Sequence, residues 1–182
     1  FQELNTEHIN HFSTLGCANL MNAHGFTNMD QKDRCIKLNA NKKYPVIYSL
    51  WLKGALPEKT TNFRKDDMLK LQMELYISRS QELFDSLQLK IKNITKLHKK
   101  MLIWGTGQLL MKLLADTELK YADIAAFIDG NHVHWGKHIN GIRILSPESI
   151  TDWNCPILIT SIIHQEEIAT EIRNRGFANE VI

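Results

Sequence analysis

The sequence contains little glycine, proline or cysteine, and it has no long apolar run. Its 182 residues include only 9 Gly, 4 Pro and 3 Cys. Together with 43% hydrophobic residues, this composition excludes a disordered or collagen-like chain. No apolar stretch approaches the ~20 residues of a membrane helix, and no signal-peptide pattern is present. We therefore expect a folded protein that does not span a membrane.

An excess of charge of either sign is also missing. The 22 Lys and Arg against 20 Asp and Glu leave a formal net charge of +2. Nucleic-acid and anionic-membrane binding usually require a strong basic field, so we expect neither partner. Cys17, Cys35 and Cys155 are scattered, odd in number and without a Cys-x-x-Cys pair. They favour buried or half-buried thiols in a reducing cytoplasm over a disulfide framework or a zinc site.

Three histidines lie close together in the sequence. His132, His134 and His138 fall within seven residues, and Asp129 is the acidic residue nearest to them. Metal sites usually combine such histidines with cysteine or acidic ligands at fixed spacing. We interpret this segment as an exposed polar loop and predict no metal site.

The chain begins at Phe1 rather than at methionine, and we read it as a piece of a longer protein. Residues 1–56 predict one helix from a Ser13 cap to a stop at Gly25. Strands around 34–38 and 44–52 follow, with a turn between them. A helix and a hairpin cannot close a core, so this part is predicted to be the remnant of a larger domain.

Residues 57–100 predict a long linking helix, because neither Gly nor Pro occurs from Glu58 to Lys100. Apolar side chains recur at steps of three and four along one stripe. The stripe comprises Leu69, Met73, Tyr76, Leu83, Leu87, Ile91 and Ile94. Such a helix packs within its own chain or against a partner helix, as in a homodimer.

Residues 101–182 alternate apolar strands with amphipathic helices. Strand patterns occur at 101–104, 124–128 and 156–160, and helical patterns follow Gly107 and Glu166. This alternation predicts βαβ units on a parallel sheet. The predicted fold class is therefore α/β, a Rossmann-like parallel sheet domain preceded by the long helix and the helix/β-hairpin remnant.

A glycine turn follows the first strand of this domain. Gly105 and Gly107 stand between the strand and the helix, and Asp129 ends the next strand. In dinucleotide sites the glycines allow a tight turn and phosphate approach, and the acid binds a ribose. Leu110 occupies the third fingerprint position, where Gly or Ala is usual. The pattern fits a nucleotide or nucleotide-sugar contact by Gly105, Gly107 and Asp129, or a tight turn that binds nothing.

A Glu-His pair precedes the first helix. His8 can act as a general base, because histidine titrates near neutral pH, and Glu7 can orient it. The same residues also fit a polar loop ahead of a helix cap.

Several motifs together resemble a known family. They are Thr6-Glu7-His8-Ile9-Asn10-His11-Phe12-Ser13, Gly25-Phe26, Tyr44-Pro45-Val46-Ile47-Tyr48, Ile103-Trp104-Gly105-Thr106-Gly107, Phe127-Ile128-Asp129, Gly136-Lys137, Ile139-Asn140-Gly141, Leu145-Ser146-Pro147-Glu148 and Gln165-Glu166-Glu167-Ile168. In this order they resemble the C-terminal region of class I S-adenosylmethionine-dependent sugar C-methyltransferases, including its Rossmann-like C-terminal domain.

The resemblance implies a catalytic site at Glu7 and His8. The histidine would remove a proton next to a ketone, and the resulting enolate would attack the methyl group of S-adenosylmethionine. The family binds this cofactor in an earlier strand-glycine-helix unit, which would lie in an N-terminal region absent from this chain. The turn at Gly105 is therefore not assigned to S-adenosylmethionine.

Three functions remain open on the sequence. The lead hypothesis is the C-terminal part of a methyltransferase acting on carbon of a nucleotide-linked sugar, with the isolated piece inactive. The alternative is a non-catalytic Rossmann-like module for substrate docking or dimerisation. A third is a nicotinamide-dependent oxidoreductase built on the glycine turn, although no Tyr-x-x-x-Lys pair is present.

Overall fold

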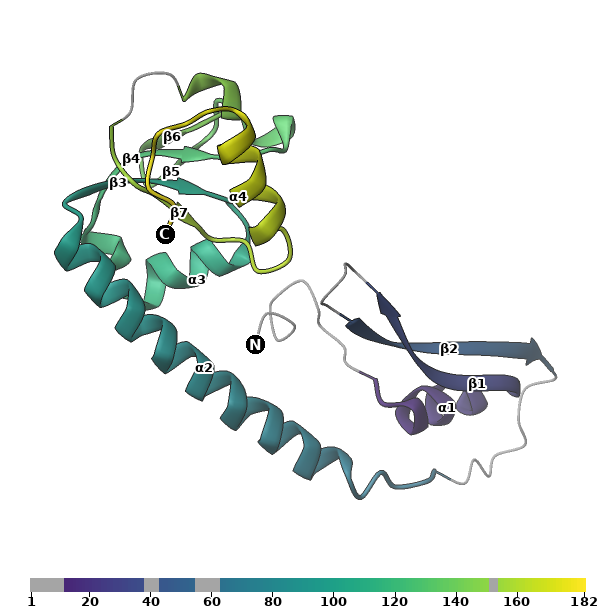
Figure 1. Ribbon diagram of the computed structural model, residues 1–182. Coiled ribbons are helices and arrows are strands. Elements are labelled where there is room, and N and C mark those ends of the chain that lie inside the picture. The colour runs from purple at the N-terminus through teal and green to yellow at the C-terminus, as the bar shows by residue number, and fades with distance from the viewer. Residues whose placement is uncertain (1–11, 38–42, 55–62, 151–153) are drawn as a thin grey trace. The chain divides into compact units, whose positions relative to one another are not determined.

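The computed structural model describes residues 12–37, 43–54, 63–150 and 154–182. The chain divides into two compact units, and the division falls between Gln81 and Glu82. It lies inside the long helix, so the segment predicted as a linker is shared by both units (Figure 1). Each unit is described by itself. Glu7 and His8 lie outside the described residues.

The first unit begins with a capped helix, as the sequence predicts. Helix α1 spans Thr14–Ala23, and the Ser13 hydroxyl oxygen accepts a hydrogen bond from the Gly16 N–H at 3.0 Å. Gly25 follows with a φ of 79°, the left-handed conformation that ends helices and favours glycine. This local chemistry fixes both ends of α1.

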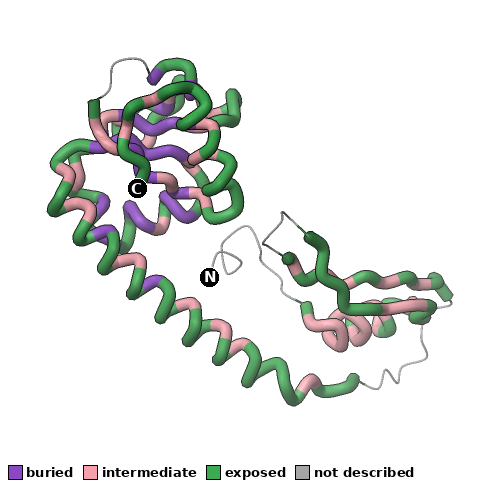
Figure 2. The backbone as a smooth tube through the Cα atoms, viewed as in Figure 1, coloured by how far each residue is buried: buried purple, intermediate pink, exposed green. Residues whose placement is uncertain are grey.

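A two-stranded antiparallel hairpin completes the first unit. Strands β1 (Phe26–Lys37) and β2 (Lys43–Lys53) pair along their length. β1 begins earlier than predicted, because a ribbon with an exposed face tolerates polar residues within a strand. No described residue from 12 to 54 is buried, and Figure 2 shows this unit in intermediate and exposed colours alone.

The long helix α2 spans Leu69–Leu97. It begins at Leu69 rather than at the predicted residue 57, because the Asp66 carboxylate accepts a hydrogen bond from the Leu69 N–H at 3.1 Å. The predicted apolar stripe includes Leu83, but the structure buries the next residue instead. Leu83 is 61% exposed and Phe84 is 5% exposed. Phe84 and Ile91 are buried, so the C-terminal half of α2 packs within the second unit.

The second unit is built on a mixed five-stranded sheet. Its strands are β3 (Lys100–Trp104), β4 (Asp123–Ile128), β5 (His138–Ile139), β6 (Ile142–Leu145) and β7 (Ile157–Ile159), in the order β5-β6-β4-β3-β7. β3 pairs in parallel with β4 and β7, and β4 pairs in parallel with β6.

The sheet is not wholly parallel, which corrects the sequence prediction. β5 pairs antiparallel with β6 through a tight hairpin. Asn140 and Gly141 form its turn with φ values of 50° and 79°. Asn-Gly is the preferred pair for a two-residue hairpin turn, because both positions require positive φ.

Helices lie against this sheet. α3 (Gln108–Asp116) runs beneath it in Figure 1, and its buried residues are Leu109, Leu110, Leu113 and Leu114. α4 (Gln165–Asn174) packs Ile172 against Leu102, Trp104 and Ile128. Short 3₁₀ helices η1 (Glu118–Tyr121), η2 (His132–His134) and η3 (Pro147–Ser149) complete the connections. Figure 2 shows the buried residues of the second unit gathered on the strands of its sheet and on α3.

The end of the chain extends the sheet beyond β7. Val181 forms a parallel bridge with Ile157, and the Ile182 N–H donates to the Ile157 carbonyl at 2.9 Å. Gly176, with a φ of 71°, ends α4 before this segment. The last two residues therefore add a short parallel bridge to the edge of the sheet at β7.

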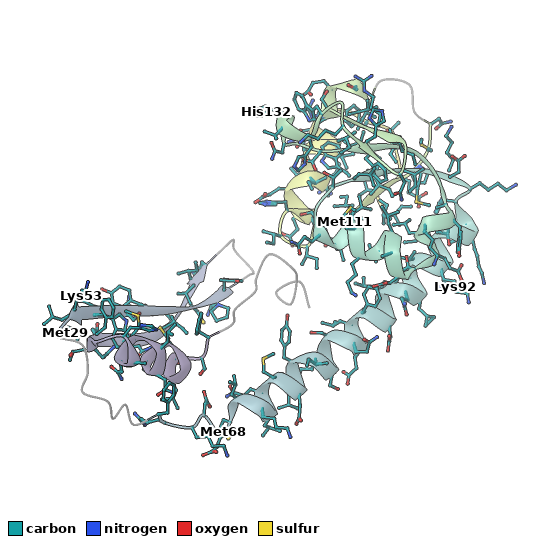
Figure 3. All side chains as sticks on the ribbon, turned by 180° about the vertical axis from the view of Figure 1, so that it is seen from behind. Met29, Lys53, Met68, Lys92, Met111 and His132 are labelled. Carbon is teal, nitrogen blue, oxygen red and sulfur yellow. The ribbon has the colours of Figure 1, made fainter. Side chains whose placement is uncertain are left out.

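The scattered cysteines and histidines carry no metal cluster in the part of the chain that the structure describes. Cys35 is exposed, against the prediction of a buried or half-buried thiol, because it lies on a hairpin open to solvent. His132 belongs to η2, which lies away from Lys92 of α2 in Figure 3.

None of the described helices combines the length and apolarity needed to cross a membrane.

Candidate functional site

A cleft of about 560 Å³ opens at the carboxyl ends of three parallel strands. Gly105, Asp129 and Thr160 line it, and they directly follow β3, β4 and β7. The chain runs outward from β3 to β4 and β6, and then returns to β7 on the other side of β3. Ligands of open α/β sheets bind at this kind of topological switch point.

Gly105 is required by the fold itself. Its φ is 109°, a conformation that residues with a side chain rarely adopt. A Cβ at this position would lie 3.3 Å from the Thr160 hydroxyl oxygen. That hydroxyl donates a hydrogen bond of 2.6 Å to the Gly105 carbonyl, which ties the β3–α3 turn to the end of β7.

Gly107 differs from Gly105, because nothing in the described structure requires a glycine there. It is the N-cap of α3 with a φ of −78°, and a Cβ would meet no atom within 4 Å. No side chain caps the helix at this position. The N-terminus of α3 therefore lies beside the cleft with no side-chain cap from residue 107, and backbone donors at such a position can bind an anion.

Asp129 joins two loops of the site. Its Oδ2 accepts a 3.0 Å hydrogen bond from the Thr106 N–H and another from the Thr106 hydroxyl, while Oδ1 accepts from the Asn131 N–H at 2.8 Å. His134 Nδ1 lies 3.3 Å from the same Oδ2 and 3.0 Å from the Thr106 hydroxyl oxygen. The side chain is only 14% exposed. The carboxylate therefore positions the glycine turn, and its predicted ribose contact stays a prediction.

These contacts set the pKa of Asp129. Burial acts to raise the pKa, but hydrogen bonds from Thr106, Asn131 and His134 outweigh it and hold the pKa below its usual value of 3.8. A carboxyl whose pKa is lower in the folded state stabilises the fold above its unfolded pKa. That stabilisation is lost as the pH falls through the depressed value.

Replacing Asp129 with asparagine should lower the free energy of unfolding by about 1–3 kcal/mol at pH 7, because an amide N–H₂ would face N–H and O–H donors. Urea denaturation measures this difference. Exposed Asp123→Asn, in the strand that leads to Asp129, should change it by less than about 0.5 kcal/mol. The Asp129→Asn effect should shrink as the pH falls below 3.8. An equal effect for both variants would exclude the positioning role.

The opposite wall of the cleft comes from the β7–α4 connection. His164 is the N-cap of α4, and its Nδ1 lies 2.7 Å from Glu167 Oε2. The His164 N–H donates to the Ser161 hydroxyl oxygen at 3.2 Å. Glu171 also lines the cleft and is paired with Arg175 at 2.8 Å. This wall is therefore polar and acidic.

An apolar rim lies beside these polar groups. Ile162 and Ile163 line the cleft and are 37% and 44% exposed. Exposed isoleucines at a cleft offer a contact surface to a ring without charge. The cleft can thus accept a ligand with an apolar or ring-shaped part and an anionic part.

Sequence reasoning found Gly105, Gly107 and Asp129, and the structure brings all three to one cleft. It missed His134 and His164. The signal that finds them is the polar segment after each buried strand, since the carboxyl ends of parallel strands meet at one sheet edge. Glu7 and His8 are not among the described residues, so their predicted catalytic roles stay predictions.

Comparison with known proteins gives one similarity. A family model described as C2185-like, N-terminal, matches residues 97–182. The matched range covers the sheet, α3, α4 and every residue that lines the cleft. No curated protein and no solved structure matches the chain.

Proposed function

We propose that the chain is the C-terminal part of an S-adenosylmethionine-dependent methyltransferase that methylates a carbon of a nucleotide-linked sugar. In this proposal the second unit is a Rossmann-like domain that binds the nucleotide part of the substrate. The observation that carries it is the cleft at the sheet's switch point, with the N-terminus of α3 beside it.

Gly107 supports binding rather than mere folding. Its backbone conformation and its open surroundings suit any residue, whereas Gly105 is needed for the turn. A glycine without a structural requirement, at the start of a helix beside a cleft, leaves room for a phosphate to reach the backbone N–H groups. The apolar rim at Ile162 and Ile163 then suits the base or the sugar.

The chemical step is assigned to Glu7 and His8 through the family resemblance. His8 takes the proton from the carbon next to a ketone, and Glu7 orients the imidazole. The resulting enolate carbon would accept the methyl group. The cofactor supplies the methyl group and is held by the N-terminal region of the intact enzyme. We place the enzyme in the cytoplasm, in keeping with its free thiols.

A non-catalytic docking or dimerisation module is the second candidate. The observation that favours it is the occupied carboxylate of Asp129, whose oxygens already accept hydrogen bonds from Thr106 and Asn131. A turn held in this way needs its glycine and its acid without any ligand. The two candidates differ in whether Glu7 and His8 of this chain take part in methyl transfer.

Calorimetric titration of the chain with uridine diphosphate glucose and thymidine diphosphate glucose tests the binding role. We expect one of them to bind in a 1:1 complex, and Gly107→Val to weaken binding at least about tenfold, because the side chain blocks the helix N-terminus. Gly54→Val, outside the cleft, should bind as the wild type does. Absence of binding of both sugars, or tight binding of S-adenosylmethionine or NADH to this chain, would contradict the proposal.

A further inference from the structure

We propose that His134 and His164 are the phosphate-binding side chains of the cleft, so that a nucleotide-linked sugar binds more tightly as the pH falls. This inference rests on the proposed function, because it concerns the same cleft. It assigns the charge that holds the ligand to His134, which the sequence placed in an exposed polar loop, and to His164, to which the sequence assigned no role.

The two imidazoles stand on different walls of the cleft. His134 ends η2 after strand β4, and His164 begins α4 after strand β7. Both are accessible, with side chains 38% and 61% exposed. A ligand at the carboxyl edge of the sheet therefore meets one histidine from each side.

Each imidazole is paired with a carboxylate through the same ring nitrogen. Nδ1 of His134 lies 3.3 Å from Asp129 Oδ2, and Nδ1 of His164 lies 2.7 Å from Glu167 Oε2. A carboxylate partner fixes the orientation of the imidazole ring. In each pair Nε2 is the second nitrogen, which can donate a hydrogen bond to a phosphate oxygen.

The cleft has no other side-chain source of positive charge among the described residues that line it. Three carboxylates line it, those of Asp129, Glu167 and Glu171, and no Lys or Arg does. Arg175 lies outside the lining and pairs with Glu171 and with Glu148, at 2.8 Å and 3.0 Å. A diphosphate therefore enters an acidic cleft, and its charge is met by backbone N–H groups and by whichever imidazoles carry a proton.

The sign of the pH dependence follows from linkage. Histidine changes charge between about pH 5 and 8, and an anion binds the protonated form better. Binding must then increase the number of bound protons, and the dissociation constant must fall with falling pH. One fully coupled imidazole changes the dissociation constant by at most about tenfold for each pH unit.

The test is calorimetric titration with uridine diphosphate glucose between pH 5.5 and 8.5, a range in which the ligand's diphosphate keeps a constant charge. We expect the dissociation constant to be at least about tenfold lower at the acidic end. His134→Gln and His164→Gln should each reduce this span, and the double variant should abolish it. His138→Gln, in β5 and outside the lining, should keep the full span.

A second readout does not depend on the variants. Titration of the wild type near pH 7, in two buffers of different ionisation enthalpy, should show net proton uptake on binding. Absence of binding at every pH would overturn the proposed function. Binding without pH dependence or proton uptake, or with a span that both histidine variants retain, would overturn this inference and leave the proposed function standing.

Discussion

Gly105→Ala should lower the free energy of unfolding of the second unit by about 2–4 kcal/mol. A residue with a side chain forced to a φ of 109° costs about 1–3 kcal/mol. Its Cβ would also lie 3.3 Å from the Thr160 hydroxyl oxygen, and this close contact would weaken the hydrogen bond from that hydroxyl to the carbonyl of residue 105. Urea denaturation followed by circular dichroism measures the change, which should appear in the unfolding transition of the second unit.

Gly107→Ala is the matched control, two residues along the same turn. Its φ of −78° suits alanine, and its Cβ would meet no atom within 4 Å. We expect a loss of about 0.5–1 kcal/mol, because glycine is preferred over alanine at an N-cap, and this loss stays below that of Gly105→Ala. If Gly105→Ala and Gly107→Ala lower the free energy of unfolding equally, the assignment of Gly105 to the fold and of Gly107 to ligand binding is wrong.

His8→Ala should reduce methyl transfer by the full-length protein about 10²–10⁴-fold, the usual contribution of a general base. Without an imidazole, nothing in the proposed site takes the proton from the carbon beside the ketone. The assay follows label from S-adenosylmethionine into a nucleotide-linked keto sugar, with substrate binding measured separately.

His11→Ala is the control for this loss, because it removes a neighbouring histidine to which the resemblance assigns no role. It should retain most of the activity. A His8→Ala enzyme that transfers methyl groups at the wild-type rate would remove the catalytic assignment and favour the docking module.

Much of the second unit was predictable from sequence because its strands β3, β4 and β7 and its helix α3 are largely buried. The predicted helical pattern after Gly107 forms α3, and its four leucines are all buried. The apolar run at 124–128 forms β4, which lies between two parallel neighbours. A strand enclosed in this way needs apolar residues throughout, which leaves a clear pattern.

The remaining features depend on contacts between distant segments. Thr106 and Asp129 are separated by 23 positions in the sequence. Only the folded sheet shows that the Thr106 N–H donates a hydrogen bond to the Asp129 carboxylate. The long helix shows the same limit, because both Leu83 and Phe84 fit a stripe until packing selects Phe84. The β5–β6 hairpin is different, since its Asn140-Gly141 pair was visible and would have predicted it.

Backbone NMR of the chain during titration with uridine diphosphate glucose shows directly where the ligand binds. We expect amide shift changes at residues 105–109, 129–134 and 161–168, the segments that carry the lining of the cleft. S-adenosylmethionine should leave these amides unchanged. Shift changes confined to other residues, or none at saturating sugar nucleotide, would contradict a ligand-binding cleft at the carboxyl edge of the sheet.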